Sequence, residues 1–199
     1  MRLKRPDTGE MLMYIRDLKL YILLAGAVFF GSMAAGYQYS QANPEAIKSI
    51  VEEIIKEFAQ FKDYPLPVLM LRIFAQNTML SFLALLLGLG FGVLSLAFLA
   101  YNGWIIGLVI YEVQQKLGLQ YIIAGLVPHG IIEVPMILIS VAIGLRLGVE
   151  VIRVILGSGN LRGEFKKGLI IYIFLVVPLL FIAALVEISI TPLIIFISR

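Results

Sequence analysis

The stretch Leu126–Gly148, LVPHGIIEVPMILISVAIGLRLG, has the apolar composition of a membrane span but carries two ionisable residues near its start. His129 is the only histidine of the chain, and Glu133 follows it by four residues. Residues i and i+4 share one face of an α-helix, so the two side chains are expected to point the same way. The same face continues through Ser140 and Gly144. We therefore expect it to pack against protein rather than lipid.

The whole chain has the composition of a membrane protein. Of its 199 residues, 60% are hydrophobic, and the mean hydropathy is +0.96. Apolar runs of about 20 residues recur, which fits a hydrocarbon core about 30 Å thick. The fold class predicted is all-α: a polytopic transmembrane bundle of about five spans, forming a single membrane domain over residues 1–199. The apolar run after the polar segment 1–19 indicates a retained helix rather than a cleaved signal peptide.

Charge and cysteine content exclude several other classes of function. A net charge of +3, scattered along the chain, gives no basis for nucleic-acid binding. The absence of cysteine excludes disulfides and cysteine-based metal or redox sites. We expect no cofactor and no bound metal.

The hydrophobic runs predict where each span begins. The first span is predicted over residues 20–39, the second over 72–100 and the last over 169–188 with a kink at Pro178. Asn102-Gly103 predicts a turn, which leaves Trp104–Val113 as a short third span that crosses fully only if it takes residues from before Asn102. The fourth span is either one long helix kinked at Pro128 or a helix that begins near Pro128 inside the membrane.

Three segments are predicted outside the spans. Residues 1–19 form a basic segment that includes a short amphipathic surface helix, residues 43–63 form an amphipathic helix introduced by Asn43-Pro44, and residues 146–168 form a basic loop. The positive-inside rule places both basic segments in the cytoplasm of a cell-membrane protein. With five spans, the C-terminus and the 43–63 helix are then extracytoplasmic.

Small residues mark the helix faces that are expected to pack closely. Asn77, Ser81, Gly88 and Gly92 share one face of the predicted second span, and this face matches the small-residue face of the 126–148 helix. We infer that the two helices pack together. The other packing glycines predicted are Gly103, Gly107, Gly130 and Gly144. Several such faces in one chain favour a homo-oligomer.

Five residues form the candidate polar core: His129, Glu133, Asn77, Glu187 and Asn102. A charge inside the membrane costs about 2.5–3.5 kcal/mol on insertion scales, so each needs a partner or water. Three interpretations remain open: a buried network that fixes helix register, an ion or substrate path, and a catalytic site. The third is the weakest, because catalytic zinc takes three protein ligands and no His-Glu-x-x-His motif is present.

These residues together resemble the stage II sporulation protein M family of integral membrane proteins. The resembling positions are Asn77 and the glycines after it, Asn102-Gly103, the Pro128–Glu133 run, Gly144, and Glu187 with Thr191-Pro192. The resemblance implies a five-span membrane protein. The founding member of that family works in a membrane complex with cell-wall-degrading partners in spore-forming bacteria.

The predicted function is a membrane scaffold or assembly component without enzymatic activity. Its expected partners are the lipid bilayer, further copies of itself and other membrane proteins. The alternative is an ion, proton or small-molecule channel or transporter that uses the polar core, and an intramembrane metal-assisted hydrolase comes third.

Overall fold

The chain forms a helical bundle in a computed structural model, which describes residues 6–45, 47–49, 51, 53 and 64–189; for residues 124–126, 128 and 129 only the backbone is described. No strand occurs in these residues. Five helical segments are long and apolar enough to cross a membrane: Lys19–Ala42, Leu66–Leu89, Val93–Leu117, Gly130–Ile155 and Leu161–Ser189. The predicted fold class and number of spans are confirmed.

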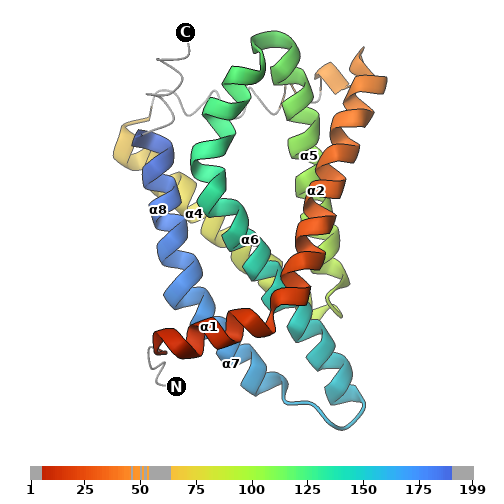
Figure 1. Ribbon diagram of the computed structural model, residues 1–199, viewed down its shortest axis with the longest axis vertical. Helices are drawn as coiled ribbons and strands as arrows, with labels where there is room; N and C mark the ends of the chain where they lie inside the picture. The colour runs from red at the N-terminus through yellow and green to blue at the C-terminus, as the bar shows by residue number, and fades with distance from the viewer. Residues whose placement is uncertain (1–5, 46, 50, 52, 54–63, 190–199) are drawn as a thin grey trace.

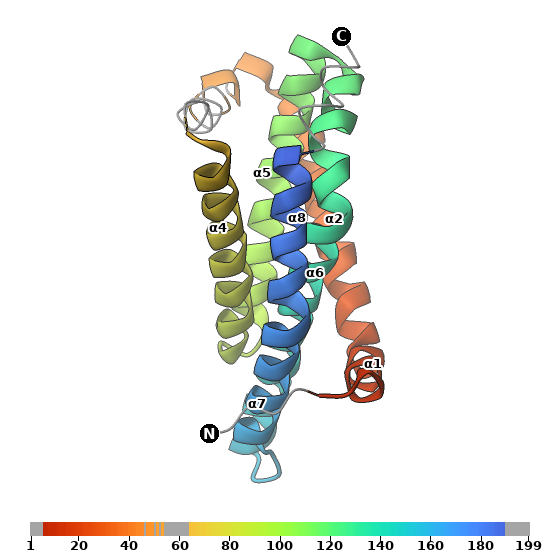
Figure 2. The same ribbon diagram turned by 90° about the vertical axis from the view of Figure 1, so that its left-hand side faces the viewer.

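The described elements are all helical. In chain order they are α1 (Thr8–Asp17), α2 (Lys19–Ala42), α4 (Leu66–Leu86), the 3-10 turn η1 (Leu87–Leu89), α5 (Val93–Leu117), α6 (Leu119–Ile155), α7 (Leu161–Ile171), the π-helical turn η2 (Tyr172–Val176) and α8 (Val177–Ser189). In Figure 1, α1 lies across the end of the bundle where α6 connects to α7, and α5 connects to α6 at the opposite end. The long helices run side by side (Figure 2).

The link between the second and third spans differs from the prediction. α4 begins at Leu66 rather than near Arg72, and the chain reverses at residues 90–92. Gly92 has a φ of 78° and Phe91 a φ of 58°, left-handed conformations that suit glycine and are uncommon for a bulky residue. The predicted second span over 72–100 is therefore wrong, because residues 93–100 open the third span.

The predicted turn at Asn102-Gly103 is also wrong. Both residues lie inside α5, a helix of 25 residues that is long enough to cross the membrane fully. The Asn102 amide donates to the Phe98 carbonyl at 2.7 Å, so it is satisfied within its own helix. In hydrocarbon, a turn would leave backbone groups without partners, and a continuous helix avoids that cost.

The fourth span is one long helix, which is the first of the two predicted alternatives. α6 runs unbroken for 37 residues through Pro128 and Pro135. A helix of this length extends about 55 Å, well beyond the hydrocarbon core. Proline removes one helical hydrogen bond and bends the helix, and α6 changes direction along its course in Figure 1.

The last span begins earlier than predicted and contains an irregular turn. α7, η2 and α8 together cover Leu161–Ser189. The Val177 N–H donates to the Tyr172 carbonyl, five residues back, as in a π-helix. Pro178 has no N–H, and its ring crowds the carbonyl of Phe174. The widened turn therefore sits directly before the proline for which the kink was predicted.

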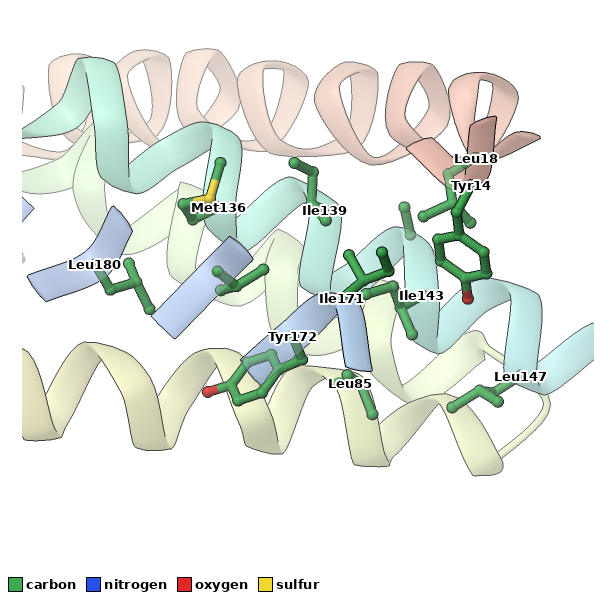
Figure 3. Close-up of a cluster of buried hydrophobic side chains, with 12 residues drawn as sticks. Tyr14, Leu18, Leu85, Met136, Ile139, Ile143, Leu147, Ile171, Tyr172 and Leu180 are labelled. Carbon is green, nitrogen blue, oxygen red and sulfur yellow. The ribbon is translucent and has the colours of Figure 1, made fainter. Parts of the chain in front are cut away.

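The largest buried cluster joins α1, α4, α6 and the last span (Figure 3). Leu18, Ile143 and Leu180 within it are fully buried. α1 is fixed at its start by a capping box between Asp7 and Glu10. Its Tyr14 is buried and its Met11 and Ile15 pack against this cluster, whereas Leu12 is 65% exposed.

Most of the predicted amphipathic helix over 43–63 falls outside the described residues. Of those described, Ile47 and Val51 are buried against Leu108 of α5. The backbone carbonyl of Asn43 accepts from the Ile47 N–H, as at a helix start, but its side chain donates to the Tyr39 carbonyl at 3.0 Å. That side chain therefore caps the end of α2 rather than the helix that follows.

Candidate intramembrane cavity

A cavity of about 760 Å³ lies between α2, α4, α5 and α6. Its lining residues come from the middle of α2, α4 and α5 and from the N-terminal half of α6, so it lies deep in the predicted membrane layer. Most of them are apolar: Phe29, Phe30, Met33, Leu80, Phe98, Leu99, Ile106, Ile110, Ile122, Val127, Gly130, Ile131, Val134, Pro135, Ile137 and Leu138. Phe30, Val127 and Ile131 are 51%, 45% and 67% exposed. The cavity therefore opens at the outer wall of the bundle.

Three of the predicted polar residues line this cavity from three different helices. They are Asn77 of α4, Asn102 of α5 and Glu133 of α6, and Ser81 is the remaining polar residue of the wall. The Asn77 side chain lies within hydrogen-bonding reach of the Glu133 carboxyl group. Because a carboxylate only accepts, the amide NH₂ is the donor and the Asn77 carbonyl oxygen stays available as an acceptor.

The structure places the other two predicted residues differently. Glu187 of α8 lies close enough to Glu133 for the two carboxylates to repel each other, although it does not line the cavity. The backbone of His129 belongs to α6, but its side chain lies outside the described residues. The predicted pairing of His129 with Glu133 therefore stays a prediction.

A second polar group lies behind the cavity wall and was not predicted from the sequence. Tyr172 donates its hydroxyl to the Thr78 carbonyl at 2.5 Å, and the same hydroxyl lies 3.1 Å from the Ser81 hydroxyl. These contacts join α4 to the π-helical turn of the last span. A tyrosine in the middle of an apolar run was the available signal, because a buried hydroxyl requires a partner.

The small residues near the α4–α5 turn bring helices into backbone contact. A Cβ added at Gly88 would fall on the backbone of Gly144, and one added at Gly148 would fall on Gly92. The Ser95 hydroxyl, beside Gly144, donates to the Ala84 carbonyl at 2.5 Å. At this end of the bundle, glycine is required by the approach of two backbones.

Other predicted packing glycines behave differently from one another. Cβ atoms added at Gly103 and Gly107 would meet α2, at the Phe29 and Met33 carbonyls. At Gly130, in contrast, an added Cβ would meet no described atom within 4 Å. Gly130 lines the cavity, so its missing side chain leaves open volume rather than a close contact.

Charged residues pair where α1, α6 and α7 meet. Arg146 contacts Glu164 at 2.7 Å and Asp17 at 3.9 Å, and its guanidinium lies 5.0 Å from the centre of the Tyr14 ring. Burial raises the pKa of Tyr14 above its usual value, and the nearby Arg146 opposes that shift only in part. Tyr14 therefore stays neutral and serves as a packing and cation–π partner.

The cavity wall combines apolar surface with a few polar side chains. Among the described residues, no group of three or more histidine, cysteine, aspartate or glutamate side chains is arranged to hold a metal ion. The wall offers apolar surface with a few oxygen acceptors, which suits an apolar molecule that carries one polar group.

Fold and site together define a multi-span helical membrane protein with a cavity in its membrane-embedded part. The sequence model of the family described as stage II sporulation protein M matches residues 20–192. The chain belongs to this family, and the resemblance drawn from its motifs is confirmed. No curated protein and no solved structure matches the chain.

Proposed function

We propose that the protein acts by binding rather than catalysis, holding a hydrophobic molecule in the cavity between α2, α4, α5 and α6. The observation that carries this proposal is the cavity itself, about 760 Å³ with an almost entirely apolar wall. Ligand sites in proteins typically enclose about 300–1,000 Å³ and place a few polar groups in an apolar lining. The exposed rim at Phe30 and Ile131 supports entry from the lipid phase.

The test fills the cavity without disturbing the fold. Gly130→Phe adds a ring where an added Cβ meets no described atom, and Ala97→Phe adds the same ring on the exposed side of α5, away from the lining. Binding of radiolabelled dodecanol to protein in nanodiscs is measured in excess of empty nanodiscs. We expect Gly130→Phe to lose the excess and Ala97→Phe to keep it. Equal binding by both variants overturns the proposal.

Holding a ligand is distinguished from transporting it by flux. In proteoliposomes, a transporter releases a trapped labelled substrate, whereas a binding component does not. We expect no release above that of protein-free liposomes. Release that is lost in Glu133→Gln would instead indicate a transport path past this carboxyl group.

A second proposal is that the protein is a scaffold that assembles with itself in the membrane. One face of α2 supports this role, because its small residues remain exposed in the monomer: Ala27, Gly31, Ala34 and Ala35. Such faces let transmembrane helices approach closely. The glycines of α5 give no such support, since they are used against α2 within the chain.

The assembly proposal is tested by crosslinking. The chain has no cysteine, so Gly31→Cys introduces a single thiol on this face and Tyr101→Cys a matched exposed thiol on α5. We expect oxidation in native membranes to give a covalent dimer for Gly31→Cys alone. Monomer in both samples contradicts an α2 interface.

We further propose that the N-terminal end lies in the cytoplasm. α1 and the α6–α7 link lie at the same end of the bundle (Figure 1), and both belong to the basic segments that the positive-inside rule assigns to the cytoplasm. In right-side-out vesicles, a membrane-impermeant maleimide should label Asn43→Cys and spare Ser158→Cys. The reverse pattern inverts the orientation.

A further inference from the structure

The polar groups of the cavity wall include three side chains that can accept a hydrogen bond. Glu133 offers a carboxylate, and Asn77 retains its carbonyl oxygen after donating to that carboxylate. Asn102 donates one of its two amide N–H groups to the Phe98 carbonyl at 2.7 Å, and its carbonyl oxygen remains available to accept. A molecule seated in the cavity therefore meets three acceptors from three helices.

Two acidic side chains lie near these acceptors. Glu133 lies within repulsive range of Glu187. Among the described side chains that line the cavity, none is a lysine or arginine. A carboxylate in a membrane is costly, and a cation beside it offsets part of that cost.

We infer that the ligand is a hydrophobic ammonium compound: an alkyl or aryl chain fills the apolar part of the cavity, and a protonated amine faces Glu133, Asn77 and Asn102. The ammonium group supplies three donors and no acceptor, which matches the three acceptors of the wall. The chain of such a molecule matches the apolar surface that makes up the rest of the lining. Charge and hydrogen-bond complementarity thus point to the same chemical class.

The experiment compares three ligands that differ only in their head group. Because this ligand class rests on the proposed function, radiolabelled dodecylamine, dodecanol and dodecanoate are each bound to protein in nanodiscs of zwitterionic lipid and corrected for empty nanodiscs. We expect dodecylamine to bind about tenfold more tightly than dodecanol, the difference that one charge-assisted hydrogen bond provides. Dodecanoate should bind weakest, because it adds a negative charge beside Glu133.

The variants assign the preference to individual residues. Glu133→Gln keeps a side chain of the same shape without the negative charge, and it should lower the affinity for dodecylamine to that for dodecanol. Glu187→Gln should weaken the preference without abolishing it. If Glu133→Gln fails to fold, Asn102→Leu serves as a second variant, because it removes one acceptor and should lower amine affinity more than alcohol affinity.

The outcomes separate the two levels of the proposal. Equal binding of all three ligands, or a preference that survives Glu133→Gln, overturns the ammonium inference and leaves the cavity as a binding site. Binding of none of them above empty nanodiscs overturns the proposed function itself.

Discussion

The two halves of α6 meet their neighbours in opposite ways. In the C-terminal half, Gly144 and Gly148 lie against the backbone at Gly88 and Gly92. In the N-terminal half, Gly130 faces the cavity, and no described atom lies within 4 Å of the position of its Cβ. Glycine in α6 thus brings two backbones together in the C-terminal half and leaves open cavity volume in the N-terminal half.

The difference follows from how α4 and α5 are connected. They form a hairpin linked by residues 90–92, and that link brings Gly92 against α6 at one end. Farther along, Asn77 of α4 and Asn102 of α5 line the two sides of the cavity. A short link thus fixes the packing beside it, and the spacing at the far end of a hairpin depends on contacts with other helices.

The largest effect on stability is expected at the end of the bundle where Gly88 lies against Gly144. Gly88→Ala places a methyl group on the Gly144 backbone, and a backbone cannot move aside as a side chain does. We expect a loss of about 3 kcal/mol in unfolding free energy, the upper end of the range for overpacking. Steric trapping in bicelles measures it, with Gly31→Ala on the exposed face of α2 as the control. A loss below that of the control contradicts the close contact.

Ser95→Ala removes the hydrogen bond to the Ala84 carbonyl at the same end. We expect a loss of about 1 kcal/mol, within the range measured for interhelical hydrogen bonds in membranes. The same unfolding assay measures it, with Ser158→Ala in the exposed α6–α7 link as the control. An unchanged unfolding free energy would mean that packing at this end of the bundle depends on the glycine contacts alone.

At the cavity, Asn77→Ala removes the hydrogen-bond donor to Glu133. We expect a loss of about 0.6 kcal/mol, the average for such bonds in a membrane protein. Asn77→Ala, Glu133→Ala and the combined variant form a double-mutant cycle that isolates the pair. A coupling energy of zero would show that the two side chains do not interact in the membrane.

The smallest effect, and one of opposite sign, is expected at Gly130. Gly130→Ala adds a methyl group that meets no described atom, and alanine favours a helix over glycine by up to about 1 kcal/mol. We therefore expect unfolding free energy to rise slightly. A loss as large as that of Gly88→Ala would remove the distinction between the two halves.

The number and type of the spans followed from hydrophobicity, but their ends did not. Arg72 was taken as the start of the second span, whereas it lies inside α4, is exposed, and reaches the Tyr64 ring at 5.8 Å. A long arginine side chain can carry its charge out of the apolar layer. Starting the span at Leu66 moves its end to the turn at residues 90–92.

Local turn chemistry misled the sequence analysis at two places. Asn102-Gly103 has the composition of a turn in water, yet inside a membrane the amide bonds its own helix at Phe98. Residues 88–92, Gly-Leu-Gly-Phe-Gly, have the composition of a packing face, yet they contain the reversal. The glycines were correctly singled out, but composition alone does not show which of them reverse the chain.

The grouping of polar residues was accessible to sequence reasoning only in part. Asn77 and Glu133 were proposed to meet from the matched small-residue faces of their helices, and both line the cavity. The cavity itself was not predicted, because an empty volume depends on the spacing of four helices. Tyr172 was overlooked because its contact with Thr78 depends on the π-helical turn before Pro178.

The α4–α5 link also bears on how the protein enters the bilayer. Residues 90–92 are Gly-Phe-Gly, with no charge and no polar side chain. A link of three residues leaves neither helix room to insert without the other, so we expect α4 and α5 to enter the bilayer as one unit. Because loop charge sets the orientation of membrane segments, this pair receives its direction from basic residues elsewhere in the chain.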